Sequence, residues 1–120
     1  MMSGINIVLP FPPSVNNYWK KWQNRIVISA EGRKYRQTVV YEVLLQKAGK
    51  HFTTPLKMEI EVFRPDKRRR DLDNLLKATQ DALCHAGVYD DDCQIHDLRI
   101  YWAKEMGGKL RVSITEIENV

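Results

Sequence analysis

The sequence has few cysteines and no long apolar run. Its only two cysteines, Cys84 and Cys93, are too few for the dense disulfide framework of small secreted domains, so we expect a reduced compartment. No segment approaches the roughly 20 apolar residues that cross a bilayer. The N-terminal residues lack the basic and apolar regions of a secretory signal. These absences predict a cytoplasmic protein with no membrane partner.

The chain is also too short to enclose two hydrophobic cores. Its 120 residues predict one domain, residues 1–120, since a second core would be too small to be stable. Hydrophobic residues make up 43% of the chain and charged residues 28%, as in ordinary globular proteins. The net charge of +4 is a modest excess that favours a polyanionic partner.

Hydrophobic periodicity and turn residues predict the secondary structure. Strands are expected at Ile5–Leu9, Arg25–Ser29, Leu56–Phe63, Ile95–Lys104 and Lys109–Ile117. Helices are expected from Ala30 to about Lys47 and from Leu72 to Ala86. The pair Gly107–Gly108 predicts a tight hairpin between the last two strands. This order predicts an α+β domain, with two main helices packed on a mixed β-sheet.

The apolar positions also predict which faces of these elements are buried. In the strand Leu56–Phe63, Met58, Ile60 and Val62 alternate with charged residues, so they should face the core. Ser29 is the expected N-cap of the first helix. The buried face of that helix is predicted to contain Tyr35, Val39, Val40, Val43 and Leu44.

Four consecutive basic residues, Lys67 to Arg70, stand directly before Asp71 and Asp73 at the start of the second helix. Asp73, Lys77 and Asp81 are spaced four residues apart, so they share the face of that helix opposite its leucines. In the ordinary interpretation, Asp71 caps the helix and the other three side chains form weak ion pairs. The basic run would then be a solvated loop.

Three further carboxylates, Asp90 to Asp92, follow the same helix. Adjacent carboxylates repel one another, and a divalent cation such as Mg²⁺, which takes oxygen ligands, would relieve the repulsion. The helix is about 20 Å long, so the segment must fold back for Asp92 to join Asp71 and Asp73. Beside a basic run that binds phosphates, such a cation site is typical of a metal-dependent phosphodiesterase acting on nucleic acid. Lys77 would stabilise the charge that develops on the phosphate.

The longest motif of the chain joins the basic run, the second helix and the acidic turn, as RRRDLDNLLKATQDAL at residues 68–83 and AGVYDDDCQI at residues 86–95. In this motif the chain closely resembles the RusA family of Holliday-junction resolvases. The resemblance continues in LPFPPSVNNYW (9–19), ISAEGRKYR (28–36) and GGKLRVSITE (107–116), so it covers nearly the whole chain. It implies an obligate homodimer from a phage or prophage, active in DNA recombination and repair. It further implies a Mg²⁺-dependent endonuclease, with Mn²⁺ as a substitute cation, that resolves four-way DNA junctions by paired symmetric nicks.

The resemblance also implies roles for individual residues. The residues that match the catalytic positions of the family are Asp71, Asp73, Lys77 and Asp92, and the three aspartates among them match its metal ligands. The family has a pair of acids where this chain has three. Asp91 is therefore a rival to Asp92 as a metal ligand, and Asp90 is a weaker one.

Two basic segments are candidates for contacts with DNA. The basic run and the segment NNYWKKW (residues 16–22) combine cations, amides and aromatic rings, which grip phosphates or stack on bases. The predicted contact residues are Lys67, Arg68, Arg69, Arg70, Lys20, Lys21 and Asn16. In the alternative interpretation, the aromatic residues of the second segment pack on the sheet edge and its lysines only face water.

Two other functions stay open at this point. One is a non-catalytic, structure-specific DNA-binding protein whose aspartates act only as caps and ion pairs, and the other is a less selective metal-dependent nuclease. A zinc site is disfavoured, because the spacing of Cys84, His85, Cys93 and His96 contains no C-x₂-C pair. We expect a buried Cys84 and exposed histidines instead.

Overall fold

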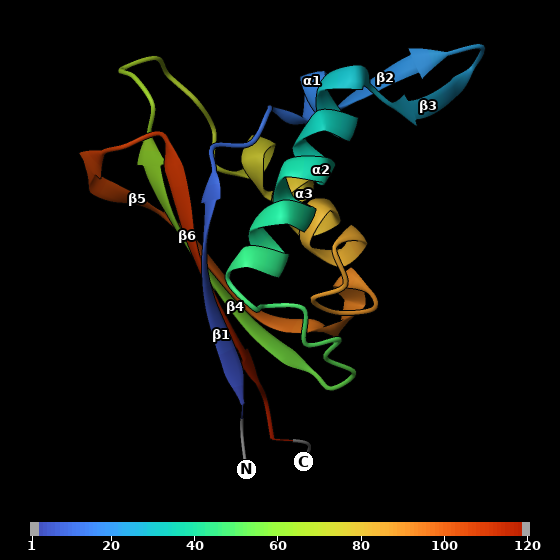
Figure 1. Ribbon diagram of the computed structural model, residues 1–120. Coiled ribbons are helices and arrows are strands. Elements are labelled where there is room, and N and C mark those ends of the chain that lie inside the picture. The colour runs from blue at the N-terminus through green and yellow to red at the C-terminus, as the bar shows by residue number, and fades with distance from the viewer. Residues whose placement is uncertain (1–2, 119–120) are drawn as a thin grey trace.

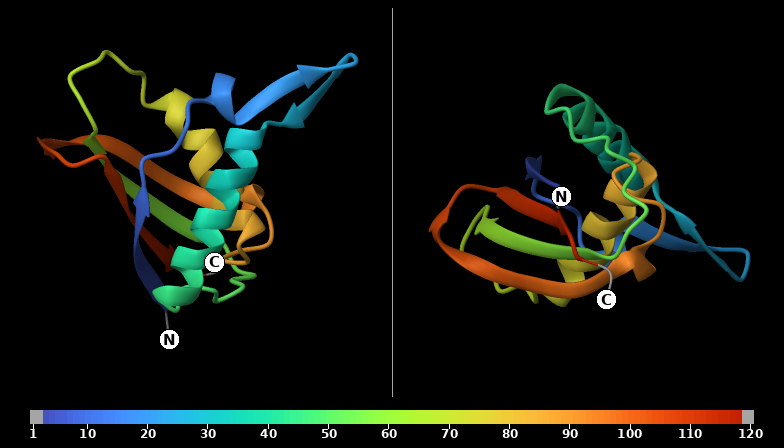
Figure 2. Two further views of the ribbon diagram at one scale, coloured as in Figure 1. Left: turned by 45° about the horizontal axis from the view of Figure 1, so that its top comes forward. Right: turned by 90° about the horizontal axis from the view of Figure 1, so that it is seen from below.

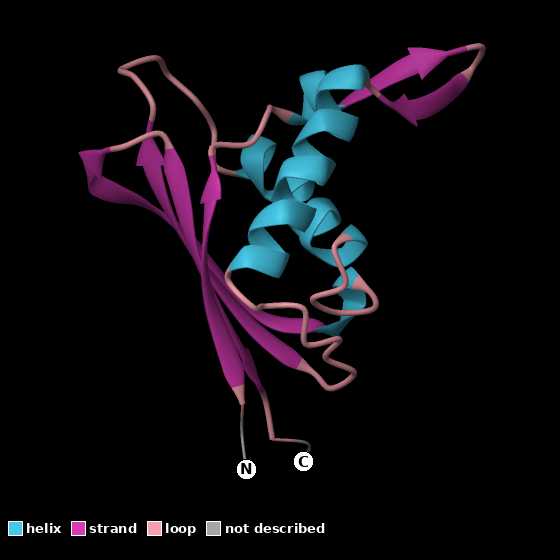
Figure 3. Cartoon of the chain, in the orientation of Figure 1, coloured by secondary structure: helices cyan, strands magenta, loops and turns pink. Residues whose placement is uncertain are grey.

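Two long helices cover one face of a β-sheet, and a separate hairpin projects from one end of the molecule (Figure 1). The computed structural model describes residues 3–118. Its elements are β1 (Gly4–Pro10), α1 (Val15–Tyr18), β2 (Trp19–Trp22), β3 (Arg25–Ile28), α2 (Ala30–Leu45), β4 (Leu56–Arg64), α3 (Asp73–His85), the 3₁₀ turn η1 (Asp92–Gln94), β5 (Ile95–Met106) and β6 (Lys109–Glu116). None of the helices within residues 3–118 has both the length and the apolar character to span a membrane. The predicted α+β class, with two main helices on a mixed sheet, is confirmed (Figure 3).

The main sheet has the strand order β1-β6-β4-β5. β6 runs antiparallel to both β1 and β4, whereas β4 and β5 are parallel. Parallel neighbours need a crossover connection, because the end of the first strand and the start of the second lie at opposite ends of the strand pair. α3 is that connection, so the helix that carries the candidate site is fixed against the sheet at both ends.

The hairpin predicted at Gly107–Gly108 is wrong, because β4 lies between β5 and β6. The two glycines do form a turn, with a φ of 63° at Gly108, but the turn spans the end of β4. The N–H groups of both glycines donate to the carbonyl oxygen of Arg64, at 2.9 and 3.1 Å. A glycine pair marks a sharp reversal in either arrangement, so the sequence cannot distinguish a hairpin from a turn around an inserted strand.

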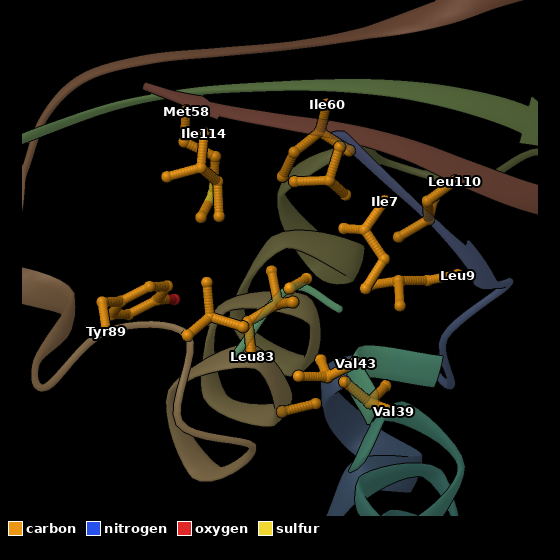
Figure 4. Packing of buried hydrophobic residues seen from close by; sticks show 14 of the residues in the cluster. Ile7, Leu9, Val39, Val43, Met58, Ile60, Leu83, Tyr89, Leu110 and Ile114 are labelled. Atoms are coloured by element: carbon orange, nitrogen blue, oxygen red, sulfur yellow. The ribbon is translucent and has the colours of Figure 1, made fainter. Parts of the chain in front are cut away.

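The hydrophobic core lies between the sheet and the two long helices. Alternate residues of β4 point toward the helices, as predicted, and Met58, Ile60 and Val62 are fully buried. Figure 4 shows side chains of the sheet facing side chains of α2, α3 and the following turn: Ile7, Leu9, Met58, Ile60, Leu110 and Ile114 on one side, and Val39, Val43, Leu83 and Tyr89 on the other. Burial of each such side chain contributes about 1.5–3 kcal/mol relative to exposure, so this interface holds α2 and α3 in place.

Helix α2 begins as predicted and ends two residues earlier than expected. The Ser29 side chain accepts a hydrogen bond from the Gly32 N–H at 2.9 Å and is the N-cap. The helix stops at Leu45 rather than at about Lys47. The buried residues of the helix are Gly32, Tyr35, Val39 and Val43. Leu44 was expected among them but is 74% exposed. It lies about 100° around the helix axis from the buried Val43 and so points away from the core.

The segment Trp19–Ile28 forms a hairpin that the sequence predicts only in part. The pattern predicts β3 but neither β2 nor the short helix α1 before it. β2 and β3 pair antiparallel from Trp19 opposite Ile28 to Trp22 opposite Arg25. The two turn residues, Gln23 and Asn24, have φ values of 47° and 60°, as a type I′ turn requires. We call residues Trp19–Ile28 the hairpin arm, and both views in Figure 2 show it standing away from the main sheet.

Gly32 allows the hairpin arm to approach α2, and its replacement tests that contact. A Cβ at position 32 would lie far inside contact distance of the Tyr18 carbonyl oxygen and 2.8 Å from Ile28 Cγ1. Alanine normally stabilises a helix relative to glycine by about 1 kcal/mol. Here we expect Gly32→Ala to lower the free energy of unfolding by about 1–3 kcal/mol, because of overpacking. Urea denaturation followed by circular dichroism measures the change.

Gly49→Ala is the matched control for this substitution. A Cβ at Gly49 would meet only Val43 Cγ1, at an ordinary 3.5 Å. Its free energy of unfolding should stay within about 0.5 kcal/mol of the parent value. Equal unfolding curves for Gly32→Ala and Gly49→Ala would contradict the close approach of Tyr18 to α2.

Candidate active site

The loop between β4 and α3 carries the basic run and is held in shape by Asp66. The Asp66 carboxylate accepts hydrogen bonds from the Arg70 guanidinium, at 2.6 and 3.1 Å, and from the Arg68 backbone N–H, at 2.9 Å. The Arg70 guanidinium also lies over the Phe11 ring, 5.3 Å from its centroid. These bonds, chiefly that from Arg70, hold the pKa of the Asp66 carboxyl well below its usual range. Arg70 therefore orders the loop before any ligand binds.

The other basic residues of the loop face solvent. The Arg68 side chain is 83% exposed, and Lys67 and Arg69 are exposed as well. Beside them is a cleft of about 520 Å³ that is lined by Arg64, Arg69, Arg70, Asp71 and Asn74. The Arg64 guanidinium lies 3.8 Å from the centroid of the Trp102 ring. The cleft thus combines three cations with a single carboxylate, which suits an anionic ligand.

The start of α3 leaves two carboxylates exposed. The first helical residue is Asp73, and Leu72 occupies the N-cap position with helical φ and ψ and no side-chain hydrogen bond. The ordinary interpretation, in which the Asp71 side chain caps the helix, is therefore wrong. Its backbone carbonyl oxygen, not its carboxylate, receives a bond, from the Asn74 N–H at 3.2 Å. Within residues 3–118, the carboxylates of Asp71 and Asp73 make no hydrogen bond or ion pair.

The ion pairs that the ordinary interpretation assigns to Lys77 are absent from the described part of the chain. Asp81 instead pairs with Arg36 of α2, with Nε–Oδ2 at 2.9 Å and Nη2–Oδ1 at 3.1 Å. The Tyr18 hydroxyl donates to the same carboxylate and accepts from Arg36 Nε at 3.1 Å. Burial and the Asp81 carboxylate raise the pKa of Tyr18 above its usual range. Asp81 is therefore committed to packing between helices, and Lys77 is left exposed on the face that it shares with Asp73.

The acidic turn after α3 separates the roles of two aspartates. The Asp91 side chain caps η1 by accepting from the Cys93 N–H at 2.9 Å, and the Gln94 side chain accepts from the Asp91 N–H at 2.8 Å. The Cys93 N–H holds the pKa of the Asp91 carboxyl below its ordinary value. Gln94 also donates to the carbonyl oxygens of Phe52 and Thr54, at 2.8 and 3.0 Å, which anchors the turn. Asp91 is thus engaged in local structure.

The Asp92 carboxylate feels the charges of two residues of α3, Asp81 and Lys77. Although the residue is exposed as a whole, desolvation raises the pKa of its carboxyl, and the negative charge of Asp81 acts in the same direction. Tyr89 and Lys77 act in the opposite direction. The turn therefore folds back along the C-terminal half of α3, as the sequence requires for a shared site. It does not fold back far enough, because no three carboxylate, imidazole or thiol groups within residues 3–118 gather into a metal-binding cluster.

Several residues of this region are missed by sequence reasoning. Asn74 lines the cleft. It follows Asp73 in the motif, and this position in the sequence could have identified it as a site residue. The contacts of Arg64 with Trp102 and of Arg36 with Asp81 join distant segments and leave no local signal. Cys84 is half-buried rather than buried, and its Sγ donates to the Asp90 carbonyl oxygen at 3.3 Å. The two histidines considered for a zinc site, His85 and His96, are exposed as expected.

Comparisons with known proteins agree with the motif. A family model described as Endodeoxyribonuclease RusA matches residues 10–116. The chain is 41% identical over 120 residues to the crossover junction endodeoxyribonuclease rusA of Enterobacteria phage HK97, with 99% of this chain and 100% of the relative covered. It is 43% identical over 119 residues to the protein of the same name from Enterobacteria phage 82, and 42% identical over 119 residues to that of Escherichia coli strain K12. Both matches cover 98% of this chain and 99% of the relative.

The pairing of Arg36 with Asp81 should contribute measurably to stability. Arg36→Met removes both hydrogen bonds to a carboxylate whose side chain is only 28% exposed. We expect the free energy of unfolding to fall by about 1–2 kcal/mol. The control Lys34→Met removes the same charge from an exposed position of the same helix and should change it by less than about 0.5 kcal/mol. Equal effects in urea denaturation would show that the pair is not formed in solution.

Proposed function

The chain belongs to the RusA family of endodeoxyribonucleases, and on that basis we propose that it is a crossover junction endodeoxyribonuclease. This enzyme resolves Holliday junctions by hydrolysing two phosphodiester bonds placed symmetrically about the crossover. One observation carries the catalytic half of the proposal: Asp71 and Asp73 are exposed beside a cleft lined by arginines, and their carboxylates are unpaired within residues 3–118. We further propose that residues 1–120 act as a single endonuclease domain, in the cytoplasm of a cell that carries the phage or prophage.

The basic loop is the proposed contact with the DNA backbone. Lys67, Arg68 and Arg69 are exposed, so their charges are available to phosphates, which arginine binds through paired hydrogen bonds. Arg70 has a different part in this proposal, because its ion pair with Asp66 keeps the loop in shape. Lys20, Lys21 and Asn16 extend the proposed contact surface toward the hairpin arm.

A divalent cation fits the carboxylates at the start of α3. Mg²⁺ is usually bound by one or two carboxylates together with waters and substrate phosphate, and Mn²⁺ accepts the same oxygen ligands. Asp71 and Asp73 would supply these carboxylates. When bound, the cation would polarise the scissile phosphate and lower the pKa of a bound water. Lys77 lies one turn further along the face of Asp73, and its ammonium group would stabilise negative charge on the phosphate or the leaving oxygen.

We propose that the active form is a homodimer. A four-way junction has approximate two-fold symmetry, so two equivalent sites related by a two-fold axis would cut opposite strands symmetrically. One feature of the single chain supports this proposal. Leu98 is 41% exposed on the helix-covered side of β5, where a partner would cover it.

Asp71→Asn tests the catalytic assignment. The substitution keeps the size of the side chain but removes an anionic oxygen ligand, so nicking of a synthetic four-way junction in Mg²⁺ should fall by about a hundredfold or more. Junction affinity should be unchanged or higher, because a negative charge near the phosphates is lost. Gel analysis of nicked strands and fluorescence anisotropy measure the two quantities.

The control for this experiment is Asp97→Asn, an exposed carboxylate of β5 on the sheet face that the helices do not cover. It should nick at the parent rate. Full activity of Asp71→Asn would favour the non-catalytic DNA-binding alternative. Comparable cutting of linear duplex and junction by the parent protein would favour the less selective nuclease.

Arg68→Gln tests the contact of the basic loop with DNA. The loss of one phosphate contact should reduce the slope of log affinity against log salt concentration by about 1. Lys50→Gln removes the same charge from an exposed position beyond the C-terminal end of α2, and its slope should equal that of the parent. An unchanged slope for Arg68→Gln would mean that this part of the loop does not touch the DNA.

A further inference from the structure

The hairpin arm carries exposed apolar side chains that do not contribute to the core. β2 and β3 form their own two-stranded sheet, separate from the main sheet. Ile26 is 78% exposed and Trp22 is 52% exposed. A two-stranded hairpin gains little stability from its own side chains, so these groups are available to a ligand.

The two faces of the hairpin arm have different surroundings. Residues that pair directly across an antiparallel ladder point to the same face. The pairs Trp19–Ile28 and Lys21–Ile26 therefore share one face, and Trp22 shares the other face with Arg25. An open groove of about 730 Å³ borders the first face and is lined by Val15, Asn16, Trp19, Lys20, Lys21, Ile26 and Lys77. Among the arm residues of this lining, Trp19, Lys21 and Ile26 belong to the first face and Lys20 to the other. Lys77 belongs to α3, so the groove lies between the arm and the helix that carries the candidate active site.

The lining of this groove matches one class of ligand. Its apolar surface comes from Val15, Trp19 and Ile26, its charge comes from three lysines, and no carboxylate lines it. Such a surface repels cations and accepts a ligand with a flat apolar ring and a negative group. A nucleotide has both parts, since its base stacks on apolar and aromatic side chains and its phosphate binds ammonium groups.

We propose that this groove receives an unstacked nucleotide at the crossover of the DNA junction. Its base would lie against Trp19 and Ile26, and its phosphate on Lys20 or Lys21. In linear duplex the base faces are covered by their stacked neighbours, whereas a crossover interrupts the stack. The inference rests on the proposed function for its substrate, and it adds a structural basis for selecting junctions over duplex.

The groove is preformed, because the base of the hairpin arm is tied to α3. Tyr18 is fully buried, and its hydroxyl donates to the Asp81 carboxylate of α3. Its backbone carbonyl oxygen accepts from the Ser29 N–H at 2.9 Å. The Trp19 ring packs on the Tyr18 ring with 4.3 Å between centroids. A nucleotide bound at Trp19 is therefore held at a fixed distance from Lys77, which is on the same helix as Asp81.

Ile26→Ala tests the proposal in combination with a change in the DNA. Affinity is measured by fluorescence anisotropy in EDTA, with an immobile four-way junction and with the same junction carrying abasic sites at the crossover. We expect Ile26→Ala to weaken binding of the intact junction by about five- to tenfold, on the scale of a lost base contact. The parent protein should bind the abasic junction more weakly than the intact junction, by a similar factor. The variant Ile26→Ala should bind the abasic and the intact junction with equal affinity. Such non-additivity is the signature of two groups in direct contact.

Val27→Ala is the matched control, because Val27 does not line the groove and its side chain points to the opposite face of β3 from that of its neighbour Ile26. It should respond to the abasic sites as the parent protein does. Additive effects of Ile26→Ala and the abasic sites would overturn the proposal. A parent protein that neither prefers nor nicks the junction would instead overturn the proposed function. Matching unfolding midpoints of the variants establish that the exposed substitution leaves the fold intact.

Discussion

The contact between Arg36 and Asp81 organises the functional end of the molecule. It joins two helices through residues 45 positions apart, and the Tyr18 hydroxyl adds the base of the hairpin arm to the same carboxylate. Because Asp81 is paired in this way, its carboxylate is held between the helices and forms no ion pair with Lys77. One half-buried pair therefore sets the position of the arm and the electrostatics of the candidate site.

A division of labour recurs in each charged cluster of this end. In the basic loop, Arg70 is bound to Asp66 while its neighbours face solvent. In the acidic turn, Asp91 caps η1, whereas the side chain of Asp92 has no part in that cap. Adjacent like charges repel one another unless some of them are paired or hydrogen-bonded. Here one member stabilises the local backbone, and that order makes the remaining members available to a ligand at a defined position.

The sequence predicts the fold where the information is local. Alternation fixes the buried face of β4, and Ser29 marks the start of α2, because both depend on neighbouring residues. The insertion of β4 between β5 and β6 is not predictable in this way, since the glycine turn looks the same in a hairpin. For the candidate site, the motif identifies the residues, but the partners of Asp81 and the separation of Asp92 from Asp71 depend on how distant segments pack.

The pairing of β1 with β6 has a consequence for synthesis of the protein. Residues 4–10 pair with residues 109–115, and β6 also separates β1 from β4. A nascent chain therefore lacks the strand that unites the sheet until β6 has left the ribosome, because contacts of such long sequence separation form only when both partners are present. The loop that carries the arginines follows β4, and β6 is one of the two neighbours of β4 in the sheet. The sheet that supports this loop is therefore complete only after β6 has paired with both β1 and β4.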